Sequence, residues 1–222
     1  MRSLLQIFIL VAVVWVAYVL VSPVRVAKST YDSTVAQDSE DSEDPPSWFT
    51  DVEGDFPEER VADAYQSIPH QQTTFSASVS RLDPQAAAHL ENLFRLVDLA
   101  LIQRVETSQA LFSGQERIAE YRQQMARIKR TLQTTAFSKG MTRARDLILA
   151  ALEDQARFLE RIDRFKTDRA QLAGVTLRKD TDVRLANRKL IAAYQSLMGA
   201  YAAESEENKQ AFFDHLCALD FI

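Results

Sequence analysis

The stretch DPQAAAHLENLFRLVDLALIQRV, from Asp83 to Val105, decides the fold of this chain. Asp83 suits a helix N-cap, and Pro84 suits the first helical position, where proline's missing backbone donor is not needed. A helix of this kind is stable only when neighbouring elements cover its apolar face. The apolar side chains that share this face recur at steps of three and four residues: Leu90, Leu93, Phe94, Val97, Leu101 and Val105.

Similar patterns continue towards residue 222, with breaks near 113–114, 138–140, 173–180 and 204–205. Asp180 or Thr181 and Ser205 are candidate N-caps, although the segment after Ser205 can also be read as a continuation of the helix before it. Short connections between long helices favour antiparallel neighbours. The sequence therefore predicts an all-α domain over residues 84–222, an antiparallel bundle or coiled-coil-like domain of three to five helices.

The segment Leu4–Ser22, LLQIFILVAVVWVAYVLVS, contains no charged residue. A helix of this length spans roughly 28 Å, close to the hydrocarbon core of a bilayer. The alternative is a cleaved secretory signal, but the apolar core of such a signal is shorter, usually about 7–15 residues. We expect residues 1–3 to be an N-terminal stub and residues 4–22 to be a single transmembrane helix in the lipid bilayer.

The basic residues that flank this segment give a slight preference for one orientation. Arg2 and the terminal amine stand on one side, and Arg25 and Lys28 stand on the other. This is nearly a balance under the positive-inside rule. A short stub before a long apolar segment is the usual arrangement of a signal anchor. The preference is therefore for a cytoplasmic N-terminus with the bulk of the chain exported.

Residues 23–83 have the composition of an acidic tether. Between residues 29 and 63 the chain has twelve Asp and Glu against one Arg, a net charge of −11. Such a segment buries too little apolar surface to offset the entropy lost on folding, so we expect it to be mostly disordered. Three aromatic residues within it are costly to leave in water: Trp48, Phe49 and Phe56. They are candidates for binding a partner protein, and the alternative is packing on the chain's own bundle.

The helical hairpin at 117–189 is basic, with 18 Lys and Arg against nine Asp and Glu, a net charge of +9. Such a surface can bind an acidic protein, anionic lipid or another polyanion. The alternative is a solvated face of intramolecular ion pairs. Nucleic acid is disfavoured as a partner, because no aromatic residues for base stacking are interleaved with the charges. The candidate binding residues on this surface are Arg122, Lys129, Arg130, Arg157, Arg161 and Arg164.

Residues that could carry catalysis are few. The three histidines, His70, His89 and His215, are far apart in the sequence, and no pair has metal-ligand spacing. The chain has no HExxH, CxxC, Walker or GxSxG motif. We therefore expect no catalytic residue, no metal site and no cofactor.

Two polar residues interrupt the apolar faces of predicted helices. Arg104 lies beside Leu101 and Val105, and Asn187 lies on the face of Leu190. Polar residues in such seams often fix the register or pair with a carboxylate on a facing helix. Asp98 is the candidate partner of Arg104.

These observations favour a membrane-tethered, non-enzymatic helical adaptor, scaffold or assembly subunit. It would act through contacts with an unknown protein partner or by self-association. The alternative is binding of anionic lipid or another polyanion by the basic hairpin 117–189. A ligand-sensing bundle or an enzyme is less favoured.

Overall fold

A computed structural model describes residues 56–68, 70–165 and 177–221 of the chain. Within these ranges there are six α-helices and no strand, so the prediction of a helical bundle is confirmed for this part of the chain. The predicted membrane anchor at 4–22, together with Trp48 and Phe49, lies outside the described residues. None of the helices within the described ranges combines the length and apolar character that a bilayer crossing requires.

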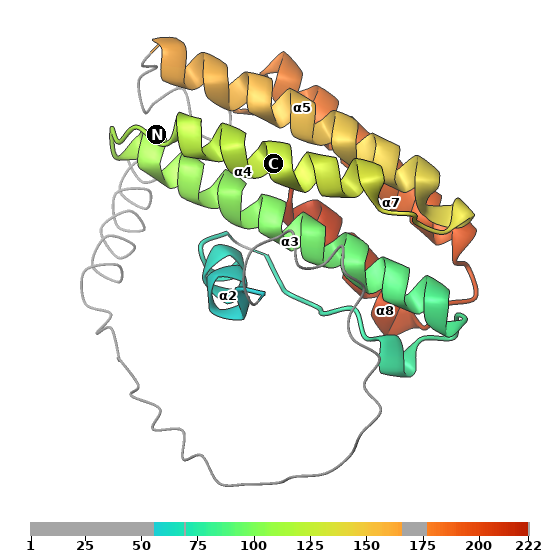
Figure 1. The fold of residues 1–222 in the computed structure, drawn as a ribbon. Coiled ribbons are helices and arrows are strands. Elements are labelled where there is room, and N and C mark those ends of the chain that lie inside the picture. The colour runs from blue at the N-terminus through green and yellow to red at the C-terminus, as the bar shows by residue number, and fades with distance from the viewer. Residues whose placement is uncertain (1–55, 69, 166–176, 222) are drawn as a thin grey trace, which may run out of the picture. The chain divides into compact units, whose positions relative to one another are not determined.

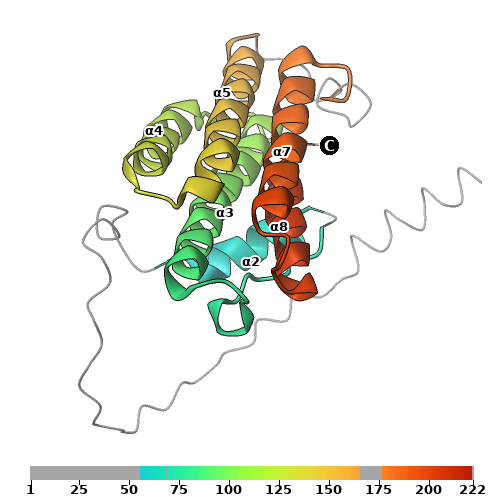
Figure 2. The same cartoon turned by 90° about the vertical axis from the view of Figure 1, so that its right-hand side faces the viewer.

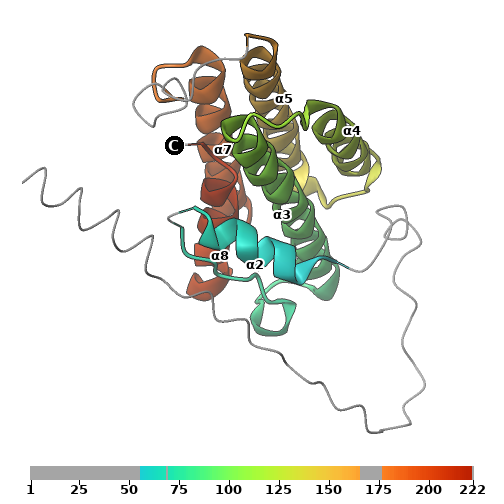
Figure 3. The same ribbon diagram turned by 90° about the vertical axis from the view of Figure 1, so that its left-hand side faces the viewer.

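The helices follow the order of the chain. Their bounds are α2 Glu58–Gln66, α3 Pro84–Phe112, α4 Ile118–Thr134, α5 Thr142–Phe165, α7 Thr181–Ala200 and α8 Glu206–Ala218, with short 3-10 turns η2 Ala77–Val79 and η3 Lys139–Met141. Figure 1 shows α3, α4 and α5 running alongside one another. Helix α7 packs along α5, and α4 lies on the other side of α5 (Figure 2). Helix α2 crosses α3 and α8 at a steep angle (Figure 3).

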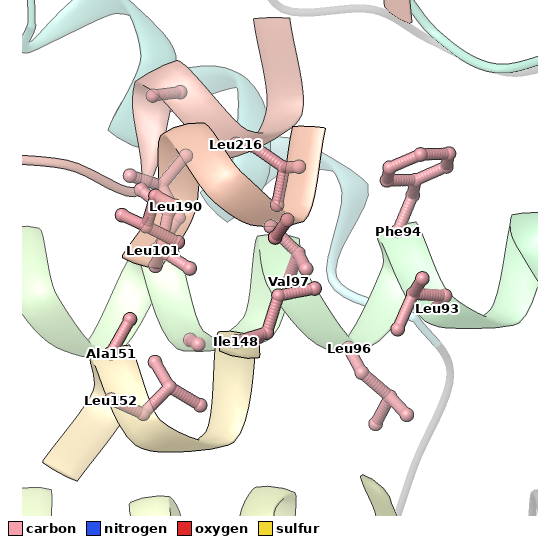
Figure 4. Close-up of a cluster of buried hydrophobic side chains, with 14 of the residues drawn as sticks. Leu93, Phe94, Leu96, Val97, Leu101, Ile148, Ala151, Leu152, Leu190 and Leu216 are labelled. Carbon is pink, nitrogen blue, oxygen red and sulfur yellow. The ribbon is translucent and has the colours of Figure 1, made fainter. Parts of the chain in front are cut away.

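Helix α3 is the common partner in this arrangement, because it contacts α2, α4, α5 and α8. Leu90, Leu93 and Leu101 are fully buried. Figure 4 shows side chains of α3 meeting Ile148 and Leu152 of α5, with residues of α7 and α8 closing the same cluster. The predicted apolar stripe of α3 is therefore the centre of the core.

Side-chain caps start three of the helices. Asp83 accepts a hydrogen bond from the backbone N–H of Ala86 at 2.9 Å, and Asp180 accepts bonds from the first turn of α7. Ser205 accepts from the backbone N–H of Asn208 at 3.2 Å, so α8 is a separate helix rather than a continuation of α7. Gly114 follows the end of α3 with a φ of 73°, a left-handed conformation that favours glycine.

The structure corrects the prediction that the tether extends to residue 83. Val61 and Tyr65 of α2 are buried, and so is Phe75 in the segment that follows. The prediction was wrong for residues 56–83 because the acidic average of residues 29–63 concealed the helical spacing of Val61, Ala64 and Tyr65. The folded domain therefore includes residues that precede Pro84.

The residues that follow α8 fold back onto the bundle. Arg104 donates a hydrogen bond to the carbonyl oxygen of Ala218 at 2.9 Å, and Asn187 donates to the carboxylate of Asp220. The predicted pairing of Arg104 with Asp98 is therefore wrong. Burial lowers the pKa of Arg104 to about 10, while Asp220 opposes this shift. The ring of Phe221 lies 5.2 Å from the Arg104 guanidinium.

Glu204, between α7 and α8, ties the segment before α3 to the bundle. Its buried carboxylate accepts hydrogen bonds from the Ser80 hydroxyl, from the backbone N–H of Arg81 at 2.9 Å and from the backbone N–H of Ser205 at 2.7 Å. Burial acts to raise the pKa of Glu204, but these hydrogen bonds outweigh burial and hold the pKa below its ordinary value of 4.5.

Replacing Phe75 with alanine tests whether residues 56–83 belong to the folded domain. Its ring lies 5.8 Å from the Phe94 ring and 6.1 Å from the Phe212 ring. Loss of a buried phenylalanine leaves a cavity, so we expect Phe75→Ala to lower the free energy of unfolding by about 3 kcal/mol in denaturant titrations. Val79→Ala, at a side chain that is 46% exposed, is the control and should cost less than about 0.5 kcal/mol. If Phe75→Ala costs as little stability as Val79→Ala, residues 56–83 do not belong to the folded domain.

A pH series with Glu204→Gln tests the role of Glu204. A carboxyl group whose pKa is lowered by folding stabilises the fold above its unfolded pKa, and this contribution is lost as the pH falls through the folded pKa. We expect the stability gap between wild type and Glu204→Gln to be largest at pH 7 and to close below pH 4.5 in urea titrations. Glu207→Gln, at an exposed carboxylate, should show little gap at either pH. A Glu204 gap that stays constant into acid would contradict this assignment.

Candidate functional site

Three side chains from distant parts of the chain form a buried polar cluster, which we call the Tyr65–Asp98–His215 cluster. The Tyr65 hydroxyl donates to Asp98 Oδ1 at 3.1 Å, and His215 Nδ1 lies 2.8 Å from the same oxygen. The Tyr65 hydroxyl also lies 3.1 Å from His215 Nδ1. Because a carboxylate only accepts hydrogen bonds, Nδ1 carries the proton in its contact with Asp98. The cluster thereby joins α2, α3 and α8.

Aromatic rings enclose the cluster. The His215 ring stacks on Phe94 with centroids 4.6 Å apart and meets Tyr65 edge to face at 6.4 Å. Burial, and then the charge of Asp98, raise the pKa of the Tyr65 phenol well above its ordinary value of 10, so Tyr65 remains a donor. Within the described ranges, His215 Nε2 is buried without a hydrogen-bond partner. The histidine is thus held from one nitrogen only.

A cavity of about 320 Å³ lies beside the cluster. Its walls come from α2, the segment between α2 and η2, α3 and α8. The lining residues are Phe56, Glu58, Val61, Gln72, Thr74, Phe75, Glu91, Phe94, Arg95, Asp98 and His215. Phe56 is partly buried, and its ring lies under the Arg95 guanidinium at 4.4 Å. Phe56, a predicted partner-binding residue, therefore contacts this chain's own α3.

Four of the six basic residues predicted as a binding surface are engaged in ion pairs. Arg122 contacts Glu160 at 2.7 Å, and Lys129 contacts Glu153 at 3.5 Å. Arg157 and Arg161 of α5 make two ion pairs each. Arg157 contacts Asp154 of the same helix and, at 3.4 Å, Asp182 of α7. Arg161 contacts Asp182 and, at 2.5 Å, the α7 N-cap Asp180.

The two remaining residues, Arg130 and Arg164, are exposed and have no ion pair within the described part of the chain. The structure therefore places the six predicted residues on neighbouring helices, but most of their charge is directed at carboxylates of the same bundle.

An exposed apolar surface lies on α7 and α8, and we call it the Ile191–Phe213 face. It consists of Ile191, which is 49% exposed, Tyr194, and Phe213, which is 43% exposed. The Tyr194 and Phe213 rings lie 5.7 Å apart, and His70 packs against Phe213 at 6.2 Å. Only the packing of α8, which buries Phe212, reveals that the next residue faces outward.

Two observations bear on metal binding and on the chemistry of the free cysteine. Among the described residues, no group of three or more His, Cys, Asp or Glu side chains could hold a metal ion. Burial raises the pKa of the Cys217 thiol, so a thiolate nucleophile is disfavoured. The features that remain are a carboxylate-lined cavity and the Ile191–Phe213 face.

Comparison of the chain with protein-family models, curated proteins and solved structures gives no match. The function is therefore argued from the residues alone.

Removing the Tyr65 hydroxyl tests the polar cluster. We expect Tyr65→Phe to lower the free energy of unfolding by about 1–3 kcal/mol, because Asp98 would lose a donor in a buried site. Tyr194→Phe is the matched control, since no hydrogen bond of the Tyr194 hydroxyl is found among the described residues. It should leave the denaturation midpoint nearly unchanged. If both variants behave alike, the hydrogen bond from Tyr65 to Asp98 contributes nothing to stability.

Proposed function

We propose that the protein is a membrane-tethered, non-enzymatic helical adaptor or assembly subunit. In this proposal residues 4–22 hold the chain in a bilayer with the N-terminus in the cytoplasm. The helical domain then binds a separate protein. The observation that carries the proposal is the Ile191–Phe213 face, where apolar side chains from two helices lie together in contact with solvent.

The charges around this face identify the chemistry of the partner. Arg184 and Arg188 are exposed on α7, seven and three residues before Ile191, so the three side chains follow one side of the helix. Neither arginine has an ion pair among the described residues. An apolar surface bordered by two cations suits an amphipathic helix with acidic residues beside its apolar stripe. We therefore assign an acidic amphipathic helix of another protein as the occupant.

The alternative of binding anionic lipid or another polyanion through the hairpin 117–189 has less support. Four of its six candidate residues already face carboxylates of the same bundle. Separating these pairs would cost part of the energy that a polyanion supplies. Arg184 and Arg188, beside the Ile191–Phe213 face, have no such carboxylate partner among the described residues.

Site-specific photocrosslinking in membranes tests this function. A benzophenone side chain introduced at Ile191 or at Phe213 in the full chain should yield a crosslinked adduct with one defined protein. The same group at Val79, which is 46% exposed and lies on a different element, is the control and should yield none. Adding Arg184→Glu and Arg188→Glu should weaken the adduct, because the two cations would become anions facing acidic residues.

The mass of the adduct separates the possible outcomes. The proposal is supported if the added mass belongs to another protein and that protein contains an acidic amphipathic helix. An adduct of twice the mass of the chain would replace the separate partner with a second copy. Equal yields at Ile191, Phe213 and Val79 would overturn the assignment of this face.

A further inference from the structure

We propose that the cavity beside the Tyr65–Asp98–His215 cluster binds a small organic ammonium ion. This site is distinct from the Ile191–Phe213 face, so the two proposals can fail independently. The inference combines the unpartnered oxygen of Asp98, the charge of the cavity lining and the apolar character of its walls.

Asp98 supplies the first element of the site. Its side chain is buried, with a relative exposure of 7%, and it lines the cavity. Both of its hydrogen bonds, from Tyr65 and from His215, end on Oδ1. Oδ2 accepts none within the described residues, and it is not among the unpartnered atoms that are sealed from solvent. A donor placed in the cavity therefore meets a carboxylate oxygen whose orientation is already held by two neighbours.

The charge of the lining selects a cation. Glu58, Glu91 and Asp98 contribute three negative charges and Arg95 contributes one positive charge, so the lining has a formal charge of −2 with His215 neutral. The Arg95 guanidinium is held over the Phe56 ring. An anionic ligand would meet more like charge than opposite charge in this cavity.

The walls select an organic cation rather than a metal ion. Val61, Phe75 and Phe94 supply apolar surface beside the carboxylates. Their rings and methyl groups offer no lone pairs to a metal, and among the described residues no three His, Cys, Asp or Glu side chains are grouped so that they could hold a metal ion. A volume of about 320 Å³ is at the small end of ligand pockets. A primary ammonium group on a short hydrocarbon fits both the acceptor and the walls.

Benzylamine is a suitable probe, and benzyl alcohol is its neutral isostere. Titration calorimetry with the full chain in lipid nanodiscs, corrected with empty nanodiscs, should show saturable binding of benzylamine. Benzyl alcohol should bind at least roughly tenfold more weakly, because it lacks the charge that Asp98 recognises. Equal affinity for the two compounds, or no saturable binding of benzylamine, would overturn the proposal.

Variants locate the site. Asp98→Asn keeps the shape of the side chain and should weaken benzylamine binding roughly tenfold. Because Asp98 also holds Tyr65 and His215, this variant can lose its fold, and a second pair of variants is therefore required. Thr74→Trp places a large side chain in the cavity from an exposed position, and Ser78→Trp places it at an exposed position outside the lining. Thr74→Trp should abolish binding and Ser78→Trp should preserve it, whereas equal binding by the two would overturn the proposal.

Discussion

The burial of α3 is the constraint on which the rest of this domain depends. A helix covered by α2, α4, α5 and α8 has little access to water, so a charged side chain on its inner surface is costly unless a group within the protein binds it. Asp98 and Arg104 are the two charged residues of α3 that are buried. Asp98 engages α2 and α8 together, and Arg104 engages the carbonyl oxygen of Ala218. The two buried charged residues of α3, Asp98 and Arg104, therefore determine where α2 and α8, at the two ends of the domain, attach to it.

Much of the helical architecture could be predicted from local sequence, because amphipathic spacing and capping are local properties. Asp83, Asp180 and Ser205 cap helices where their side chains suit that role. The partners of Asp98 could not be predicted in this way. Tyr65 and His215 are 150 residues apart, and a single sequence has no local signal that joins them. Helix α2 was not predicted for another reason. Its charged residues contribute to the acidic average of residues 29–63, and that average is typical of a disordered segment.

The candidate surfaces show a similar division. Net charge identified the basic hairpin, but it did not show that Arg122 faces Glu160 or that Arg161 faces Asp180. Ion pairs between helices depend on the rotation of each helix about its axis, which is set by the core. The outward position of Phe213 has the same origin, since α8 buries Phe212 and thereby turns its neighbour away. Residue type predicted what these side chains can do, and packing determined which of them face solvent.

The separation of Asp98 from His215 has a consequence for biosynthesis. The two residues are 117 positions apart, so at ordinary translation speeds the ribosome completes Asp98 about 6–23 s before His215 exists. During that interval Tyr65 is the only one of the two donors to Asp98 that has been made, and the apolar surface around the carboxylate has no cover from α8. The contact between Asp98 and His215 therefore forms late, because the core can close only after α8 has been synthesised.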